Sequence, residues 1–531
     1  MPCVINQDRM KRLFKQLFRV KSLSSILEES NRPDRKLKKV LGPFDLILLG
    51  IGVIIGAGIF ATVGTAAAGD AMRPGAGPAL ILSFALTAVV CGFAALCYAE
   101  LASLVPISGS AYTYSYATFG ELIAWIIGWD LMLEYVVGAI AVSISWSGYF
   151  NSLLQGIGIN LPAWSTIDFR SAMNGSAIAT AQISTGTALE KLNPGLKMSW
   201  DAVNGAPHLF GVPLICNIPA VAIVLLLTAL LVIGIKESSR FNMAIVMVKL
   251  LVLGFFVAVG AFFVRPHNWM PFAPNGFAGI KAGAAIAFFA YIGFDAISTT
   301  AEETREPEKN MPIGIIGSLA ICTLIYMAVA AVFTGIIPFQ LLRDSMAQQK
   351  AEPLALAMKY INLNWAAGVV AVGAVMAQIA VLLVLLMGQA RIFFSMARDG
   401  LLPPVFSSVH RLFKTPHVTT VLTGCIVAFF AAFTNIEEMV DLTNIGTLFA
   451  FVLVCIGVII LRKTEPARKR GFRVPLSPVT PLLGALACLF LMTGLPLITW
   501  YRFVIWLVIG LIVYFSYGVR HSHVNRNAAR K

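Results

Sequence analysis

Two apolar stretches of this 531-residue chain contain glycine where a helix could be broken. The first break covers residues 56–58, Gly-Ala-Gly, and the second covers residues 289–292, just before Gly293. Where a membrane helix unwinds, N–H groups at the start of a half-helix can hold a carboxylate, and freed carbonyls can hold a cation. Two facing breaks would therefore fit a small zwitterion. Tight helix packing is the alternative, because Gly52 and Gly56 have small-xxx-small spacing.

Three aromatic residues beside the second break, Phe289, Tyr291 and Phe294, could shutter such a site from one side. Ordinary core packing is the alternative interpretation for each of them.

Three ionisable residues inside the predicted apolar spans are candidates for a role in such a site. Lys249 lies about 12 Å from the start of its span at 1.5 Å per residue, near the limit of snorkelling. A buried lysine titrates readily, and its ammonium can fill a cation site that Na⁺ would occupy elsewhere. Asp295 follows the second break, where a carboxylate should be paired or protonated. Glu134 shares a helix face with Asp130 but lies nearer the middle of its span, so it is the better candidate for a pocket residue.

Several kinds of chemistry have no motif in the sequence. Walker A, Gly-rich nucleotide and HExxH patterns are missing, and the six histidines fall in predicted loops or tails. The eight cysteines show neither CxxC pairs nor metal-like spacing. We therefore expect no enzyme activity, no metal and no cofactor. The net charge of +14 is concentrated in short loops, which argues against nucleic acid as a partner.

The composition predicts the elements that position these residues. Hydrophobic residues make up 58% of the chain and charged residues only 12%, which is too little polar surface for a soluble protein of this size. A helical span of the bilayer needs about 20 apolar residues. Twelve spans are predicted, at 44–68, 78–104, 122–150, 213–235, 241–264, 279–303, 313–337, 366–395, 418–434, 438–461, 478–494 and 501–518.

Most of the 40 Lys and Arg residues fall on one side of these spans, which places both termini in the cytoplasm of a cell membrane protein. The first 43 residues form a basic cytoplasmic arm with no cleavable signal peptide. Spans one and six are both broken and cross in opposite directions, as inverted repeats at 44–264 and 279–461 require. Spans eleven and twelve occupy 478–518, and a cytoplasmic tail covers 519–531.

Five segments of the chain together resemble the amino acid–polyamine–organocation superfamily, and most closely the bacterial members of its cationic amino acid transporter family. They are Gly50-Ile51-Gly52 through Phe60, Tyr98-Ala99-Glu100-Leu101 through Tyr112, Gly128-Trp129-Asp130-Leu131 through Tyr135, Phe288 through Asp295, and Arg398-Asp399-Gly400-Leu401-Leu402-Pro403. The resemblance extends over most of the chain.

The resemblance implies an all-α polytopic membrane protein with the LeuT-type fold, two inverted five-helix repeats and two further helices. It implies a main-chain site for the substrate carboxylate in the first break and for the ammonium in the second, with Glu134 linked to cationic substrates. The expected substrate-binding residues are Ile55, Gly56, Ala57, Gly58, Ile59, Glu134, Phe289, Ala290 and Ile292. Lys249 and Asp295 match residues tied to proton coupling in relatives.

The function that follows is secondary transport of L-amino acids, independent of Na⁺ and driven by protons. An exchanger of amino acids or polyamines is the alternative within this class. A transporter-like sensor or a passive channel is the alternative outside it. The resemblance leaves cationic and neutral substrates open, and the sequence names no small membrane subunit.

Overall fold

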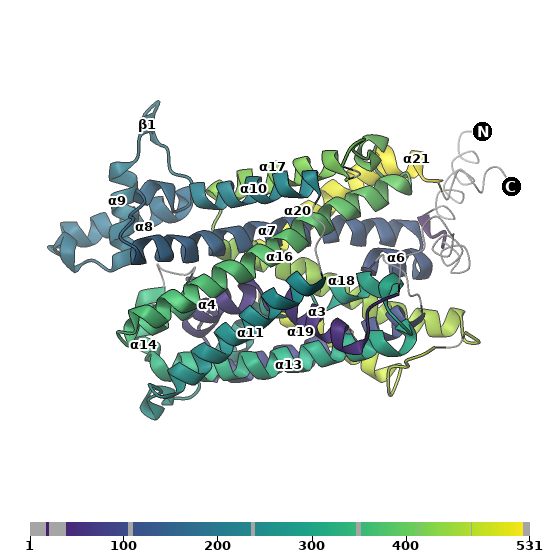
Figure 1. Ribbon diagram of the computed structural model, residues 1–531, viewed down its shortest axis with the longest axis horizontal. Helices are drawn as coiled ribbons and strands as arrows, with labels where there is room; N and C mark the ends of the chain where they lie inside the picture. The colour runs from purple at the N-terminus through teal and green to yellow at the C-terminus, as the bar shows by residue number, and fades with distance from the viewer. Residues whose placement is uncertain are drawn as a thin grey trace, which may run out of the picture.

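The computed structural model describes residues 17–20, 39–104, 110–234, 239–346, 352–413, 415–468 and 470–523. The chain is predominantly helical, and most helices run side by side in one elongated bundle (Figure 1). Most of the predicted N-terminal arm, the residues 105–109, Lys236 and the end of the predicted tail lie outside the described residues.

The first predicted span is broken as expected. Helix α3 (Pro43–Ile54) ends at Ile55, whose backbone is extended, and a π-helical turn, η1 (Gly58–Thr62), leads into α4 (Val63–Ala68). The sixth span is broken as well. Helix α12 (Gly276–Ala287) continues as a 3₁₀ turn, η6 (Phe288–Tyr291), and Gly293, with φ +116°, precedes a second 3₁₀ segment, η7 (Asp295–Glu303).

The remaining α-helices are α5 (Leu80–Leu104), α6 (Ser110–Thr118), α7 (Glu121–Gly156), α8 (Phe169–Ser184), α9 (Pro194–Gly205), α10 (Ile218–Ile233), α11 (Ser239–Ala261), α13 (Pro307–Ile336), α14 (Phe339–Met346), α15 (Pro353–Tyr360), α16 (Asn364–Arg398), α17 (His417–Phe433), α18 (Ile436–Thr464), α19 (Val479–Met492), α20 (Leu497–Val513) and α21 (Val519–His521). Short turns are η2 (Gly77–Ala79), η3 (Ala163–Ser165), η4 (Leu189–Lys191), η5 (Pro266–Trp269), η8 (Pro404–Ser407) and η9 (Tyr514–Gly518). Two strands, β1 (His208–Leu209) and β2 (Val212–Pro213), pair antiparallel.

Among the described residues, nine helical segments are long and apolar enough to cross a membrane. Three shorter apolar helices, α10, α17 and α19, occupy the ranges predicted for spans four, nine and eleven. The chain is therefore a polytopic helical protein, and its division into twelve spans stays a prediction.

The fourth predicted span begins later than expected. Residues 213–217, predicted to be helical, belong to β2 and a loop, and α10 starts only at Ile218. The reason is local, because the Asn217 side chain accepts a hydrogen bond from the Ala220 N–H and Pro219 occupies the first turn.

Long helices enclose the two breaks. Helix α7 packs along α16 and α18, while α13 packs along α3 and α5. Helices α8 and α9 pack against each other beyond one end of the bundle, and the β1–β2 hairpin projects there, whereas α6 and α21 lie at the opposite end (Figure 1). We call the α8 end the outer end, following the predicted orientation.

Candidate functional site

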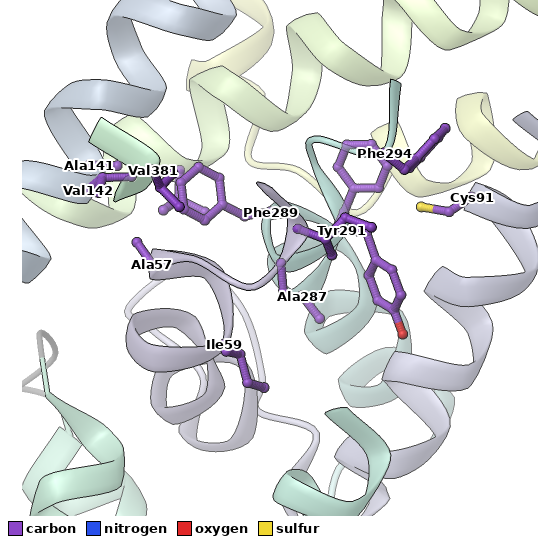
Figure 2. Packing of buried hydrophobic residues seen from close by; sticks show 14 of the residues in the cluster. Ala57, Ile59, Cys91, Ala141, Val142, Ala287, Phe289, Tyr291, Phe294 and Val381 are labelled. Atoms are coloured by element: carbon purple, nitrogen blue, oxygen red, sulfur yellow. The ribbon is translucent and has the colours of Figure 1, made fainter. Parts of the chain in front are cut away.

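The two breaks meet at a small cavity between the helices. Its lining comes from both breaks, α7, α16 and α18, and comprises Val53, Ile54, Gly56, Ala57, Gly58, Glu134, Tyr135, Gly138, Val142, Phe289, Ile292, Gly293, Asp295, Ala296, Val381, Val384, Leu385 and Thr443. Figure 2 shows Ala57, Val142, Phe289 and Val381 around this region. Segments far apart in the sequence therefore form one pocket.

Close backbone approach explains why glycine occupies both breaks. A Cβ atom on Gly58 would collide with the backbone of Ala290, so the first break can touch the second only without a side chain there. Gly293 has a positive φ, and a Cβ on it would lie 2.7 Å from Val53. The tight-packing alternative concerned Gly52 and Gly56, where an added Cβ would lie 2.6 Å from Val246 and 2.8 Å from Val381, so close packing accompanies the unwinding there.

Tyr326 of α13 joins the two breaks. Its hydroxyl lies 2.9 Å from the carbonyl oxygen of Ile54 and 2.9 Å from that of Ala290, one on each broken helix. The side chain is fully buried. Sequence reasoning missed this residue, and the only available signal was a tyrosine inside an otherwise apolar span.

Lys249 of α11 reaches the first broken helix. Its Nζ donates a hydrogen bond to the carbonyl oxygen of Gly52 at 2.6 Å, and the residue is only 1% exposed. The lysine does not snorkel to a helix end. It instead satisfies a carbonyl one turn before the break, the type of contact a bound cation would make.

Two carboxylates share the cavity. Glu134 from α7 and Asp295 from the second break both line it. One carboxylate oxygen of Asp295, Oδ1, has no hydrogen-bond partner among the described residues. Two carboxylates that line one cavity repel each other when both are ionised.

Asp130, which sequence reasoning ranked below Glu134, is also buried, at 1% exposed. It lies one turn before Glu134 on α7 and faces Gly446 of α18 rather than the cavity. Neither of its carboxylate oxygens has a hydrogen-bond partner within the described part of the chain.

Of the other predicted substrate-binding residues, some line the cavity and some are buried beside it. Gly56, Ala57, Gly58, Phe289 and Ile292 line the cavity. The residues Ile55, Ile59 and Ala290 are fully buried beside it.

The three aromatic residues predicted to cover the site from one side also differ in position. Only Phe289 lines the cavity. The Tyr291 hydroxyl donates to the Phe84 carbonyl at 3.1 Å, and Phe294 packs against Tyr98 and Phe451. Figure 2 shows Tyr291 and Phe294 directed away from Ala57. The packing alternative is thus the correct one for these two residues.

A buried charge cluster lies toward the outer end, just after α4. Arg73 donates to Asp70 at 2.6 Å and to Asp441 of α18 at 2.8 Å. It lines a second, smaller pocket with Thr62 and Glu437. At the other end, Glu100 of α5 pairs with Arg462 of α18. Sequence reasoning missed both clusters, since each joins residues hundreds of positions apart. Within the described residues, no group of three His, Cys, Asp or Glu side chains could hold a metal ion.

Comparison with known proteins identifies the family. A family model described as amino acid permease matches residues 41–517. The chain belongs to the amino acid permease family. It is 46% identical over 510 residues to the branched-chain amino acid permease BcaP of Bacillus subtilis (strain 168), covering 96% of this chain and 99% of that protein. It is 44% identical, with the same coverage, to the methylthioribose transporter of the same organism.

A human relative extends the family beyond bacteria. The chain is 30% identical over 641 residues to cationic amino acid transporter 4 of Homo sapiens, covering 97% of this chain and 92% of that protein. The resemblance to the amino acid–polyamine–organocation superfamily, with cationic amino acid transporters as relatives, is therefore confirmed. So is the prediction that the chain is a transporter and not an enzyme.

Proposed function

We propose that this chain is a Na⁺-independent, H⁺-coupled transporter of L-amino acids, alternating access around the cavity between the two breaks. In this proposal it has the LeuT-type fold with twelve spans, lies in the cell membrane and keeps both termini in the cytoplasm. The carrying observation is that residues 56–58 and the second break line one cavity. Unwound main chain there supplies donors for a carboxylate and acceptors for an ammonium group.

Lys249 supports independence from Na⁺. Its ammonium already satisfies the Gly52 carbonyl beside the first break. A cation site filled by a side chain needs no Na⁺, and proton loss from that side chain would empty it. Lys249 can therefore link protonation to the geometry of the substrate site.

The paired carboxylates support proton coupling. Glu134 and Asp295 line the same cavity, next to the segment proposed to hold the ammonium group. A proton held by the pair, or a substrate cation in its place, relieves the repulsion between them. Binding of the substrate and of the proton would thus be linked at one place.

The remaining lining supports a neutral, aliphatic substrate side chain. Val142, Val381, Val384 and Leu385 face the cavity from α7 and α16. Gly138 lies opposite Leu385 and leaves room there, because an added Cβ would be 3.6 Å from the nearest Leu385 atom. The relative named a branched-chain amino acid permease points to the same class. A methylthioribose-like substrate is the second candidate, because a relative of that name covers 96% of this chain.

The test is uptake by purified protein in proteoliposomes. Thermal-shift screening of the standard amino acids, arginine and lysine among them, and of methylthioribose first identifies ligands. Uptake of the best ligand is then measured with an acid-outside pH gradient, with K⁺ or with Na⁺ as the bulk cation. We expect branched aliphatic amino acids to bind, the gradient to drive accumulation, and Na⁺ to have no effect.

Three outcomes would contradict the proposal. A strict Na⁺ requirement would refute the role given to Lys249. Counterflow of preloaded substrate without any gradient response would indicate an exchanger. Binding with no transport under any gradient would indicate a sensor.

A further inference from the structure

A small hairpin at the outer end exposes apolar side chains to an unusual degree. Strands β1 and β2 pair His208 with Pro213 and Leu209 with Val212, so Phe210 and Gly211 form the tip. Phe210 is 98% exposed, and Leu209 and Val212 are each 53% exposed. Figure 1 shows the hairpin projecting sideways from the bundle axis, past α10 and α17. An apolar tip this exposed needs an apolar neighbour outside the described chain.

The backbone of the tip is a second indication. Phe210 has φ +50° and Gly211 has φ +81°, so both central residues of this two-residue turn are left-handed. Such turns favour Asn, Asp or Gly, and a bulky aromatic residue at the first central position is strained. Strained residues of this kind cluster at sites that contact a ligand or partner. Phe210 is thus both poorly suited to its turn and poorly buried.

The hairpin is continuous with the surface of the bundle that faces lipid. No Asp, Glu, Lys or Arg occurs between Asp201 and Lys236. Exposed apolar side chains continue from the tip through Leu214 and Ile218 along α10 to Ile233. This uncharged segment leads directly into the apolar helix α10, and that continuity favours a place for the hairpin at the membrane surface.

The length of α10 places the membrane surface near the hairpin. Its 16 residues extend about 24 Å at 1.5 Å per residue, less than the roughly 30 Å of the hydrocarbon core. Its neighbour α17 has 17 residues, and the Asn217 N–H donates to the Ala432 carbonyl at 3.0 Å, so the two short helices reach the outer end together. When helices are shorter than the hydrocarbon core, the bilayer thins locally or the segments that flank the helices enter the membrane surface. Either adjustment brings the hairpin close to lipid.

We propose that the tip of the β1–β2 hairpin inserts into the outer leaflet of the bilayer, at the boundary between headgroups and acyl chains. Phe210, Leu209 and Val212 provide the apolar contact. The occupant is phospholipid, because the apolar surface runs without interruption onto the lipid-facing side of α10 and carries no charge to specify a protein partner. The hairpin thereby anchors α8 and α9 beside the short α10–α17 pair. This inference is independent of the proposed transport function, which it leaves unchanged if it fails.

The test measures the depth of a spin label in proteoliposomes of phosphatidylethanolamine and phosphatidylglycerol. The full-length chain carries Cys425→Ser, which removes the one exposed cysteine among the described residues, and the spectrum of this parent is subtracted. Phe210→Cys and Leu209→Cys are labelled separately. Ser184→Cys, on exposed α8, is the control in water, and Leu226→Cys, 57% exposed on α10, is the control in lipid.

The readout is the ratio of collisions with oxygen, which partitions into lipid, to collisions with a water-soluble nickel complex. We expect the ratio at both tip positions to be several-fold higher than at Ser184→Cys and to approach that at Leu226→Cys. Ratios equal to that of Ser184→Cys at both positions would place the tip in water and overturn the proposal. Dipolar broadening that grows with protein density in the membrane would assign the tip to a second copy and overturn it as well.

Discussion

The hydroxyl of Tyr326 offers a direct test of how the two breaks are held together. It lies between the carbonyl oxygens of Ile54 and Ala290, each 2.9 Å away. Tyr326→Phe removes this oxygen and leaves the ring, so the packing of the core is preserved. Both carbonyls then lose the donor that fixes their direction, and in our proposal the Ala290 carbonyl faces the ammonium group of the substrate.

The magnitude follows from the geometry. A hydroxyl carries one hydrogen, so the change removes the equivalent of one full hydrogen bond shared between two buried acceptors. Leaving a buried acceptor unpaired costs about 1–3 kcal/mol. If most of that loss appears in the bound state, a cost of about 1–2 kcal/mol raises the substrate Kd roughly 5–30-fold.

The assay is equilibrium binding of the preferred substrate to purified protein, together with thermal unfolding. Tyr514→Phe is the matched control, because the Tyr514 hydroxyl is equally buried and donates to Glu121 at 3.0 Å, far from the cavity. We expect both variants to unfold at lower temperature and only Tyr326→Phe to bind substrate more weakly. A wild-type Kd for Tyr326→Phe, or an equal rise for Tyr514→Phe, would refute the bridging role.

Three further changes address coupling and selectivity. Lys249→Met is expected to abolish accumulation of substrate driven by a pH gradient. The control is Lys281→Met, at a lysine that lies over the Phe490 ring, and it should keep this accumulation. An undiminished response in Lys249→Met would exclude a coupling role. Gly138→Ala adds a methyl group in ordinary contact with Leu385, which takes space in the cavity from a bound side chain. A loss of about 1 kcal/mol in binding of the larger substrate would shift competition for uptake roughly fivefold from leucine toward alanine. Gly92→Ala, where nothing lies within 4 Å of an added Cβ, should leave this preference as it is, and an equal shift there would contradict the size argument. Glu134→Gln is expected to reduce gradient-driven uptake of leucine but not its counterflow, and a selective loss of arginine binding would instead assign Glu134 to recognition of cationic side chains.

Much of the fold class could be predicted because membrane proteins obey strong local rules. A chain with 58% hydrophobic and 12% charged residues has too few polar side chains to face water everywhere. Glycine pairs inside apolar runs indicated the breaks, and both helices are interrupted there. Lys249 and Glu134 stood out because a charge inside a span is costly and must face the protein interior.

The prediction was weaker where a role depends on the direction of a side chain. Phe289, Tyr291 and Phe294 are all aromatic residues beside the second break, and the sequence does not distinguish their roles. Only Phe289 lines the cavity. The 3₁₀ turn and the positive φ of Gly293 change the direction of successive side chains, so the 3.6-residue period of an α-helix does not predict which of them face the cavity. Asp130 and Glu134 likewise share a helix face, but only Glu134 lines the cavity, whereas Asp130 lies against Gly446 of α18.

The sequence by itself predicted a polytopic helical protein with two glycine breaks and a lysine inside a span, because these features follow from composition and from neighbours along the chain. The prediction of a transporter came from the resemblance to a known family. Only the tertiary structure decided which groups meet. It brought Tyr326 to both breaks, Lys249 to the Gly52 carbonyl and Asp295 to Glu134. Apart from Tyr326 and Ala290, which are 36 positions apart, these residues lie more than a hundred positions apart in the sequence. Their meeting depends on how helices pack rather than on any local pattern.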